Sequence, residues 1–195
     1  YFIYVVQTLE YMEGAIIMGL SKYRDMVVAK ELSYVNVTGG YDKGDDEFIR
    51  YYNKIAGTAF NVDTTPWCAI FQTYNLRMCN IPTWVCPNFA GCGTIDDGFL
   101  KPAGFHKGYK DYIPLPGDLV IFDWNGGHCS RDHVGMVERV DGNTLYTIEG
   151  NSNGGYKVPG VRHKSYDLSS KFISLYGALP YESIDTMTNP YPVPQ

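Results

Sequence analysis

Apolar residues recur at helical spacing through the N-terminal part of the chain. Because an α-helix brings every third or fourth side chain to one face, positions i, i+3, i+4 and i+7 predict an amphipathic helix. This spacing predicts four helices, over residues 1–18, 22–34, 46–56 and 66–78. Their apolar stripes are Val5, Leu9, Met12 and Ile16; Tyr23, Met26 and Val27; Phe48, Tyr51, Tyr52 and Ile55; and Trp67, Ile70, Phe71, Tyr74 and Met78.

The fourth helix has the most distinctive start. Thr64 or Thr65 is a suitable N-cap, and Pro66 suits the first helical position, where its missing N–H costs nothing. Cys68 then lies in the first turn, at the positive end of the helix dipole, which favours a thiolate. The pattern therefore predicts a nucleophilic cysteine at this helix start. Ser21 is a similar N-cap for the second helix.

The pattern changes after the fourth helix. Residues 79–113 contain many glycines and prolines, which predict a long loop able to shape a substrate groove. From Pro116 onward, short apolar runs rich in strand-forming residues alternate with turn residues. Strands are predicted over residues 118–123, 133–140, 144–151, 161–166 and 172–179.

A turn at residues 141–143 predicts an antiparallel hairpin whose register can be counted. A three-residue loop places Gly135 opposite Glu149 and His133 opposite Asn151. Side chains alternate between the two faces of a strand, so His133, Glu149 and Asn151 then share one face. A two-residue loop would reverse the parity and turn Glu149 away from His133.

Composition limits the class of protein. At 195 residues the chain is long enough for one sizeable core, and its 17 tyrosines suit a filled core or a ligand cleft. The net charge of −5 and the absence of a basic stripe argue against nucleic acid as a partner. Glu10 and Glu13 interrupt the apolar run of residues 1–20, so this segment is predicted to be neither a signal peptide nor a membrane span.

The acidic run before the third helix suggests a calcium site, but such a site is not expected. Four carboxylates gather between residues 42 and 47, but they lack the order of an EF-hand loop. Asp45 or Asp46 is better explained as the cap of the third helix. The carboxylates are Asp42, Asp45, Asp46 and Glu47.

The cysteines leave more than one arrangement open. Five cysteines is an odd number, so at least one thiol is unpaired within the chain. Cys86 and Cys92 could form a disulfide. Cys79, Cys86, Cys92 and His106 could supply four zinc ligands, but the chain has no Cys-x-x-Cys knuckle and buried thiols are the favoured interpretation.

Cys68, His133 and then Glu149 or Asn151 follow the order of a cysteine nucleophile, a general base and an orienting group. A base of this kind needs its second ring nitrogen held by an acceptor, which a Glu carboxylate or an Asn amide supplies. His128, in a Gly-rich loop, is the rival base.

Four segments resemble, in order and spacing, motifs of the CHAP family of cysteine- and histidine-dependent amidohydrolases and peptidases, a branch of the NlpC/P60 and papain-like group. They are PWCAIF (66–71), PGDLVIFDW (116–124), DHVGMV (132–137) and YTIEGNS (146–152). The resemblance covers roughly residues 22–180. It implies an α+β papain-like fold, with helices packed on an antiparallel sheet and the nucleophile at a helix N-terminus.

The resemblance also implies roles for individual residues. Cys68 corresponds to the nucleophile, His133 to the base and Glu149 to the residue that orients it, with Asn151 as a further polar member of the site. No cofactor is implied. Trp67 and Trp124 flank the motifs and are candidates for contact with substrate.

The function that the resemblance implies is cleavage of an amide bond in bacterial peptidoglycan. The enzyme would be an N-acetylmuramoyl-L-alanine amidase or an endopeptidase of the stem or cross-bridge, as in a phage lysin or a bacterial autolysin. It would be secreted or act at the cell wall. Two alternatives remain open: an intracellular amidase or peptidase acting on a small γ-glutamyl-type substrate, and a non-catalytic wall-binding module.

Three regions are expected along the chain. Residues 1–20 form a helical segment that docks on the domain or on a second copy, with plugging of the cleft as an alternative. Residues 21–181 form the catalytic domain. Residues 182–195 are rich in proline and predict an extended linker to a further, wall-binding module.

Overall fold

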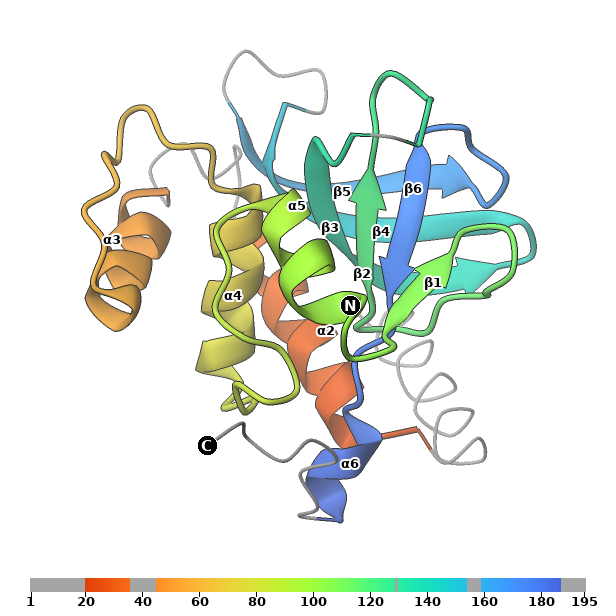
Figure 1. Cartoon of the computed structure of the whole chain (residues 1–195), viewed down its shortest axis with the longest axis horizontal. Helices are drawn as coiled ribbons and strands as arrows, with labels where there is room; N and C mark the ends of the chain where they lie inside the picture. The colour runs from red at the N-terminus through yellow and green to blue at the C-terminus, as the bar shows by residue number, and fades with distance from the viewer. Residues whose placement is uncertain (1–19, 36–44, 129, 154–158, 187–195) are drawn as a thin grey trace, which may run out of the picture.

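The computed structural model describes residues 20–35, 45–128, 130–153 and 159–186 (Figure 1). The helices are α2 (Lys22–Val35), α3 (Asp45–Ala56), α4 (Cys68–Met78), α5 (Cys92–Ile95), the π-helical turn η1 (Asp96–Leu100) and α6 (Glu182–Asp185). The strands are β1 (His106–Gly108), β2 (Leu119–Phe122), β3 (His133–Asp141), β4 (Thr144–Ser152), β5 (Gly160–Asp167) and β6 (Ile173–Gly177). The predicted helix over residues 1–18 lies outside the described residues.

The strands form one antiparallel sheet in the order β1-β6-β2-β3-β4-β5. Helices α2, α4 and α5 lie to one side of this sheet, with α3 beyond α4 (Figure 1). The α+β fold with N-terminal helices packed on an antiparallel sheet is therefore confirmed. All five predicted strands are present, and β1 is an additional one that the sequence did not predict.

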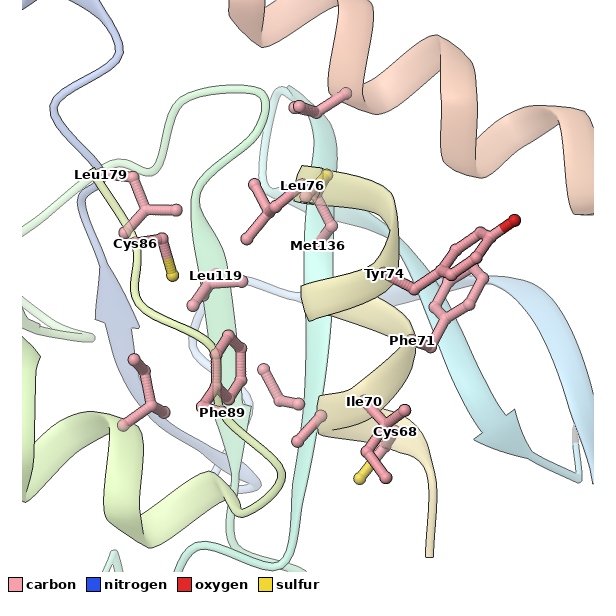
Figure 2. Close-up of a cluster of buried hydrophobic side chains, with 14 of the residues drawn as sticks. Cys68, Ile70, Phe71, Tyr74, Leu76, Cys86, Phe89, Leu119, Met136 and Leu179 are labelled. Atoms are coloured by element: carbon pink, nitrogen blue, oxygen red, sulfur yellow. The ribbon is translucent and has the colours of Figure 1, made fainter. Parts of the chain in front are cut away.

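Helix α4 is buried on all sides rather than along one stripe. Every residue from Cys68 to Leu76 is buried, whereas Met78, expected on the inner face, is 39% exposed. The reason is that α4 packs against α2 and α3 as well as against β3 and β4. Figure 2 shows its side chains gathered with Leu119 of β2 and Met136 of β3 in one apolar cluster.

The start of α4 differs from the prediction. Trp67, with φ −118°, occupies the N-cap position, and no side chain caps the helix. The two threonines expected as caps belong instead to a preceding turn, in which the N–H groups of Thr64 and Thr65 both donate to the carbonyl oxygen of Asn61. The helix therefore begins at Cys68 itself.

Helix α2 also packs through a different face. The N–H of Tyr23 donates to Ser21 Oγ at 3.3 Å, as expected for a cap. The predicted core residue Met26 is 39% exposed, however, and two charged residues, Arg24 and Glu31, are buried beside Val27. The apolar pattern failed here because charged side chains with buried partners can replace hydrophobic ones in a core.

Arg24 is the clearest example of such pairing. Its guanidinium is 2.8 Å from Asp118 and 2.5 Å from Glu182, and it also donates to the carbonyl oxygens of Pro116 and Leu179. These contacts join α2 to the start of β2 and to α6. Residues 182–185, expected to begin a linker, therefore form a helix tied to the domain, and residues 187–195 lie outside the described part of the chain.

The β3–β4 hairpin reaches the predicted register by another route. Asp141 pairs with Thr144, so the loop has two residues rather than three. A bulge at Glu138 adds one residue to β3, and beyond it Met136 pairs with Ile148. Because a bulge shifts the alternation by one residue, it compensates for the shorter loop and restores the parity on which the site depends.

The predicted loop over residues 79–113 contains α5, η1 and β1, so the expectation of a continuous loop is wrong. The glycines and prolines in this segment bound short elements instead of preventing them. Among the described residues, no helix is long and apolar enough to cross a membrane.

Replacement of Arg24 tests this buried pairing. Arg24→Ala leaves the fully buried carboxylate of Asp118 without its cation, so we expect the free energy of unfolding to fall by about 3–5 kcal/mol. Lys54→Ala, at an exposed position of α3, is the matched control and should change it by less than about 0.5 kcal/mol. Urea denaturation followed by circular dichroism measures both, and equal stability of the two variants would contradict the pairing.

Candidate active site

Cys68 is the first residue of α4. The N–H groups of the first helical turn have no partner within the helix, and the first bond of α4 is made by Phe71 N–H to the Trp67 carbonyl at 2.9 Å. The Cys68 side chain is 7% exposed. Its sulfur lies 3.8 Å from the sulfur of Cys92. The His133 imidazole and the backbone N–H of Val134 both stabilise the anionic form of this sulfur and lower its pKa.

His133, the first residue of β3, is held from its far side by Glu149 of β4. Its Nε2 lies 3.0 Å from Glu149 Oε2. Because Nε2 is engaged in this bond, Nδ1 is the ring nitrogen left to face the Cys68 sulfur. The structure therefore brings Cys68, His133 and Glu149 together in the predicted order.

The Glu149 carboxylate is fully buried and held by several groups. Thr147 Oγ1 and Tyr166 Oη each donate to Oε1 at 2.8 Å, and Ser152 Oγ lies 3.4 Å from Oε2. Lys164 Nζ is 3.5 Å from Oε2. These four side chains were not predicted. Tyr166 and Lys164 come from β5, whose register with β4 the sequence pattern does not fix, whereas Thr147 could have been found because it shares a face with Glu149 at i, i−2.

A glycine makes room for this carboxylate. A Cβ at Gly135 would lie 2.8 Å from Glu149 Cγ and 3.1 Å from the carbonyl oxygen of Ile148. Any other residue would therefore push the Glu149 side chain away from His133. Gly150 makes room on the other face of the sheet, because a Cβ at this position would lie 2.7 Å from the Phe71 side chain of α4.

The groups around Cys68 and His133 determine the protonation states of these two side chains. The hydrogen bond with Cys92 and those with His133 and Val134 lower the pKa of Cys68 to about 4, although burial opposes this. Burial lowers the pKa of His133, but its bonds to Cys68 and Glu149 outweigh burial and raise that pKa to about 9. Burial also opposes ionisation of Glu149, yet His133 keeps its pKa below the ordinary value. Near neutral pH the site holds a thiolate beside an imidazolium.

The two tryptophans differ in position. Trp124 is 42% exposed, stacks on Phe122 and lies with its ring 5.6 Å from that of His133, at the rim of the site. Trp67 is only 4% exposed and packs against Phe48 and Phe71. This burial leaves Trp67 no free face and contradicts its expected contact with substrate.

Asn151 and His128 do not join the central group. Asn151 has a left-handed φ of 54°, where the pairing between β4 and β5 is irregular, and within the described residues no hydrogen bond links its side chain to His133 or Glu149. His128 is exposed and stacks on Tyr109, with ring centroids 4.5 Å apart. His133 rather than His128 is therefore the imidazole next to the sulfur.

The structure also bears on the disulfide and zinc alternatives. Cys68, Cys79, Cys86 and Cys92 are free, buried thiols, so the structure contradicts a Cys86–Cys92 disulfide. His106 is bound to Asp96 at 2.6 Å. Across the described ranges, no three His, Cys, Asp or Glu side chains are grouped closely enough to hold a metal ion.

Of the four carboxylates in the acidic run, only that of Glu47 lies in the described part of the chain. Glu47 accepts a hydrogen bond from Tyr74 Oη. Asp42 lies outside the described residues, as do the side chains of Asp45 and Asp46.

Comparison with protein families identifies the region that carries this site. Residues 60–151 match the family model described as CHAP domain. Over these residues the chain is similar to CHAP domains, which are cysteine- and histidine-dependent amidohydrolases. The match includes Cys68, His133 and Glu149.

The solved structures that are similar to the chain include two of Ly7917. One is 15% identical, with a TM-score of 0.48, and the match covers 80% of this chain and 62% of that chain. The other, of Ly7917 with the hydrolyzing product of MDP, is 16% identical, with a TM-score of 0.47 and coverage of 80% and 63%. The chain therefore spans less than two thirds of the length of Ly7917. A comparison with curated proteins finds no similar sequence.

The charge state of Cys68 and His133 can be tested by alkylation. Because the pKa of Cys68 is lowered to about 4, its thiolate is already present at pH 5–6, where Cys79, with a pKa raised by burial to about 11, is a thiol. We expect iodoacetamide to label Cys68 at least ~10-fold faster than Cys79 at pH 6. His133→Ala should raise the pH midpoint of Cys68 labelling. Mass spectrometry of tryptic peptides gives both rates, and an ordinary midpoint near pH 8–9 in the unmodified chain would contradict the ion pair.

The space at Gly135 gives a second prediction for the site. Gly135→Ala should displace Glu149 and, because Glu149 raises the pKa of His133, lower that pKa from about 9. Gly127→Ala is the control, since the nearest atom to its added Cβ is 3.9 Å away. NMR titration of the His133 ring measures the pKa in each variant. An unchanged value in Gly135→Ala would show that Glu149 does not depend on this glycine.

Proposed function

We propose that the protein hydrolyses an amide bond of bacterial peptidoglycan, with Cys68 as nucleophile, His133 as general acid and base, and Glu149 as the residue that orients the imidazole. The observation that carries the proposal is the contact of a helix-start sulfur with an imidazole whose other nitrogen is bound to a buried carboxylate. Such a pair is the arrangement that activates a thiol for attack on a carbonyl carbon.

The reaction can be followed through these groups. The Cys68 thiolate attacks the amide carbonyl, and the resulting oxyanion is stabilised by unpaired backbone N–H groups at the start of α4. Protonated His133 gives its proton to the leaving amine, so the C–N bond breaks and a thioester forms on Cys68. A water molecule then loses a proton to His133 and attacks the thioester, which releases a carboxylic acid and restores the thiolate–imidazolium pair.

Glu149 acts on His133 rather than on the substrate. Its buried carboxylate favours the imidazolium and fixes the ring so that Nδ1 faces the sulfur. The donors around it, Thr147 and Tyr166, hold the carboxylate in one orientation. A carboxylate secured in this way keeps its geometry when the charge on His133 changes during the reaction.

The choice of peptidoglycan rests on the similarity to CHAP domains together with aromatic residues at the surface. A pocket of about 480 Å³ is lined by aromatic rings, including Tyr52, Phe60 and Phe99, and by Gly91 and Thr94 on either side of Cys92, but not by Cys68, His133 or Glu149. Trp124 offers a further exposed ring beside His133. Aromatic faces of this kind suit sugar rings and peptide planes, so we place the action of the enzyme at the cell wall.

Digestion of purified sacculi tests the function. The chain should release soluble fragments, whereas Cys68→Ala should release at least ~10³-fold less, because removal of the nucleophile abolishes the covalent step. Cys79→Ala, which removes a buried thiol away from the site, is the matched control and should retain activity. Mass spectrometry then identifies the bond: a free lactyl carboxyl group marks an amidase, and a cut stem or cross-bridge peptide marks an endopeptidase. Release by Cys68→Ala equal to that of the unmodified chain would refute the mechanism, and intact sacculi would refute the substrate.

A further inference from the structure

A second thiol lies directly against the proposed nucleophile. Cys92 is the first residue of α5, and its sulfur is 3.8 Å from that of Cys68. Both side chains are 7% exposed, so little water separates or solvates them. A distance of this size between two buried sulfurs is a hydrogen bond in which either could be the donor.

The surroundings decide which sulfur keeps its proton. Cys68 lies at a helix start and faces the His133 ring and the Val134 N–H, all of which favour an anion. Cys92 faces the negative sulfur of Cys68 and the nearby charge of Asp132, and both, with burial, raise its pKa far above the ordinary value. Cys92 therefore remains a thiol while Cys68 is a thiolate.

We propose that Cys92 donates its S–H hydrogen bond to the Cys68 sulfur and thereby holds the nucleophile as a thiolate under acidic conditions. This inference rests on the proposed role of Cys68 as nucleophile. It adds to the site a second sulfur that the order of nucleophile, base and orienting group does not require. Cys92 makes no bond to the substrate in this role and acts only through the Cys68 sulfur.

An ion pair fixes the position of the donor. Asp96, which directly follows α5, is fully buried, and its carboxylate accepts from Arg131 at 2.7 and 2.8 Å and contacts His106 at 2.6 Å. Arg131 stands two residues before His133 at the start of β3. The Asp96–Arg131 pair therefore joins the helix that carries Cys92 to the strand that carries His133, and keeps both beside the same sulfur.

The proposed donor has a distinctive pH signature. A hydrogen bond to the thiolate stabilises the anion before any substrate is attacked. Loss of this bond therefore slows the reaction of Cys68 only at pH values where the thiolate becomes the minor form. Above pH 8 the sulfur of a variant that retains His133 is ionised with or without Cys92. A purely structural role for Cys92 would instead reduce reactivity by the same factor at every pH.

Alkylation of Cys68 across pH 3–10, in the presence of a phosphine reductant, tests the inference without any cell-wall substrate. Cys92→Ala should raise the midpoint of iodoacetamide labelling by at least one pH unit, and so slow labelling about 10-fold at acidic pH while leaving it unchanged at pH 8. Cys92→Ser, which keeps a donor, should retain the acidic midpoint. Cys79→Ala is the control and should behave as the unmodified chain. Arg77 places Cys68 and Cys92 in separate tryptic peptides, so the two labels are distinguished.

Several results would overturn the inference. They are an unchanged midpoint in Cys92→Ala, an equal loss of reactivity at all pH values, or a Cys92→Ser variant whose midpoint moves up to the ordinary range. If Cys92→Ala does not fold, the serine variant alone decides between donor and packing. Failure of the chain to digest sacculi, with the alkylation profile intact, would count against peptidoglycan as substrate and leave the role of Cys92 standing.

Discussion

The close packing of α4 on β3 and β4 is the contact on which the rest of this structure depends. It carries the Cys68 sulfur to the end of the sheet at which β3 begins with His133. The approach is close because Gly150 leaves space for the Phe71 side chain. An α4 held further from the sheet would leave an acidic thiol without a partner, since the helix dipole alone favours the anion but supplies no proton for the leaving group.

Several of the buried charged side chains in the molecule are paired. Arg24 joins α2 to β2 and α6, Glu149 holds His133, and Asp96 joins α5 to the approach to β3. A buried charge without a partner costs several kcal/mol, so each pair fixes two segments relative to one another more strictly than apolar contacts do. Two of the three pairs border the active site, where the position of a single atom determines reactivity.

In the β3–β4 hairpin, the predicted register near the site is correct although the predicted loop length is wrong. The sequence pattern placed Glu149 on the face of His133 by assuming a three-residue loop. The actual loop has two residues, and a bulge at Glu138 restores the same register. Loop length and bulges both shift strand parity by one residue, and the residue pattern of a single strand does not reveal where an extra residue is accommodated. The predicted inner face of α2 was wrong for a related reason, because Arg24 is buried by partners that lie far away in the sequence.

The sequence by itself indicated the α+β class, helices α2 to α4, strands β2 to β6, and Cys68, His133 and Glu149 as the central residues, because periodicity and motif order are local properties of the chain. Only the tertiary structure decided that Trp67 is core, that Tyr166 and Lys164 support Glu149, and that Cys92 touches the nucleophile. These facts depend on contacts between segments that no spacing along the chain encodes. They are set by which faces pack together and by the pairing of buried polar groups.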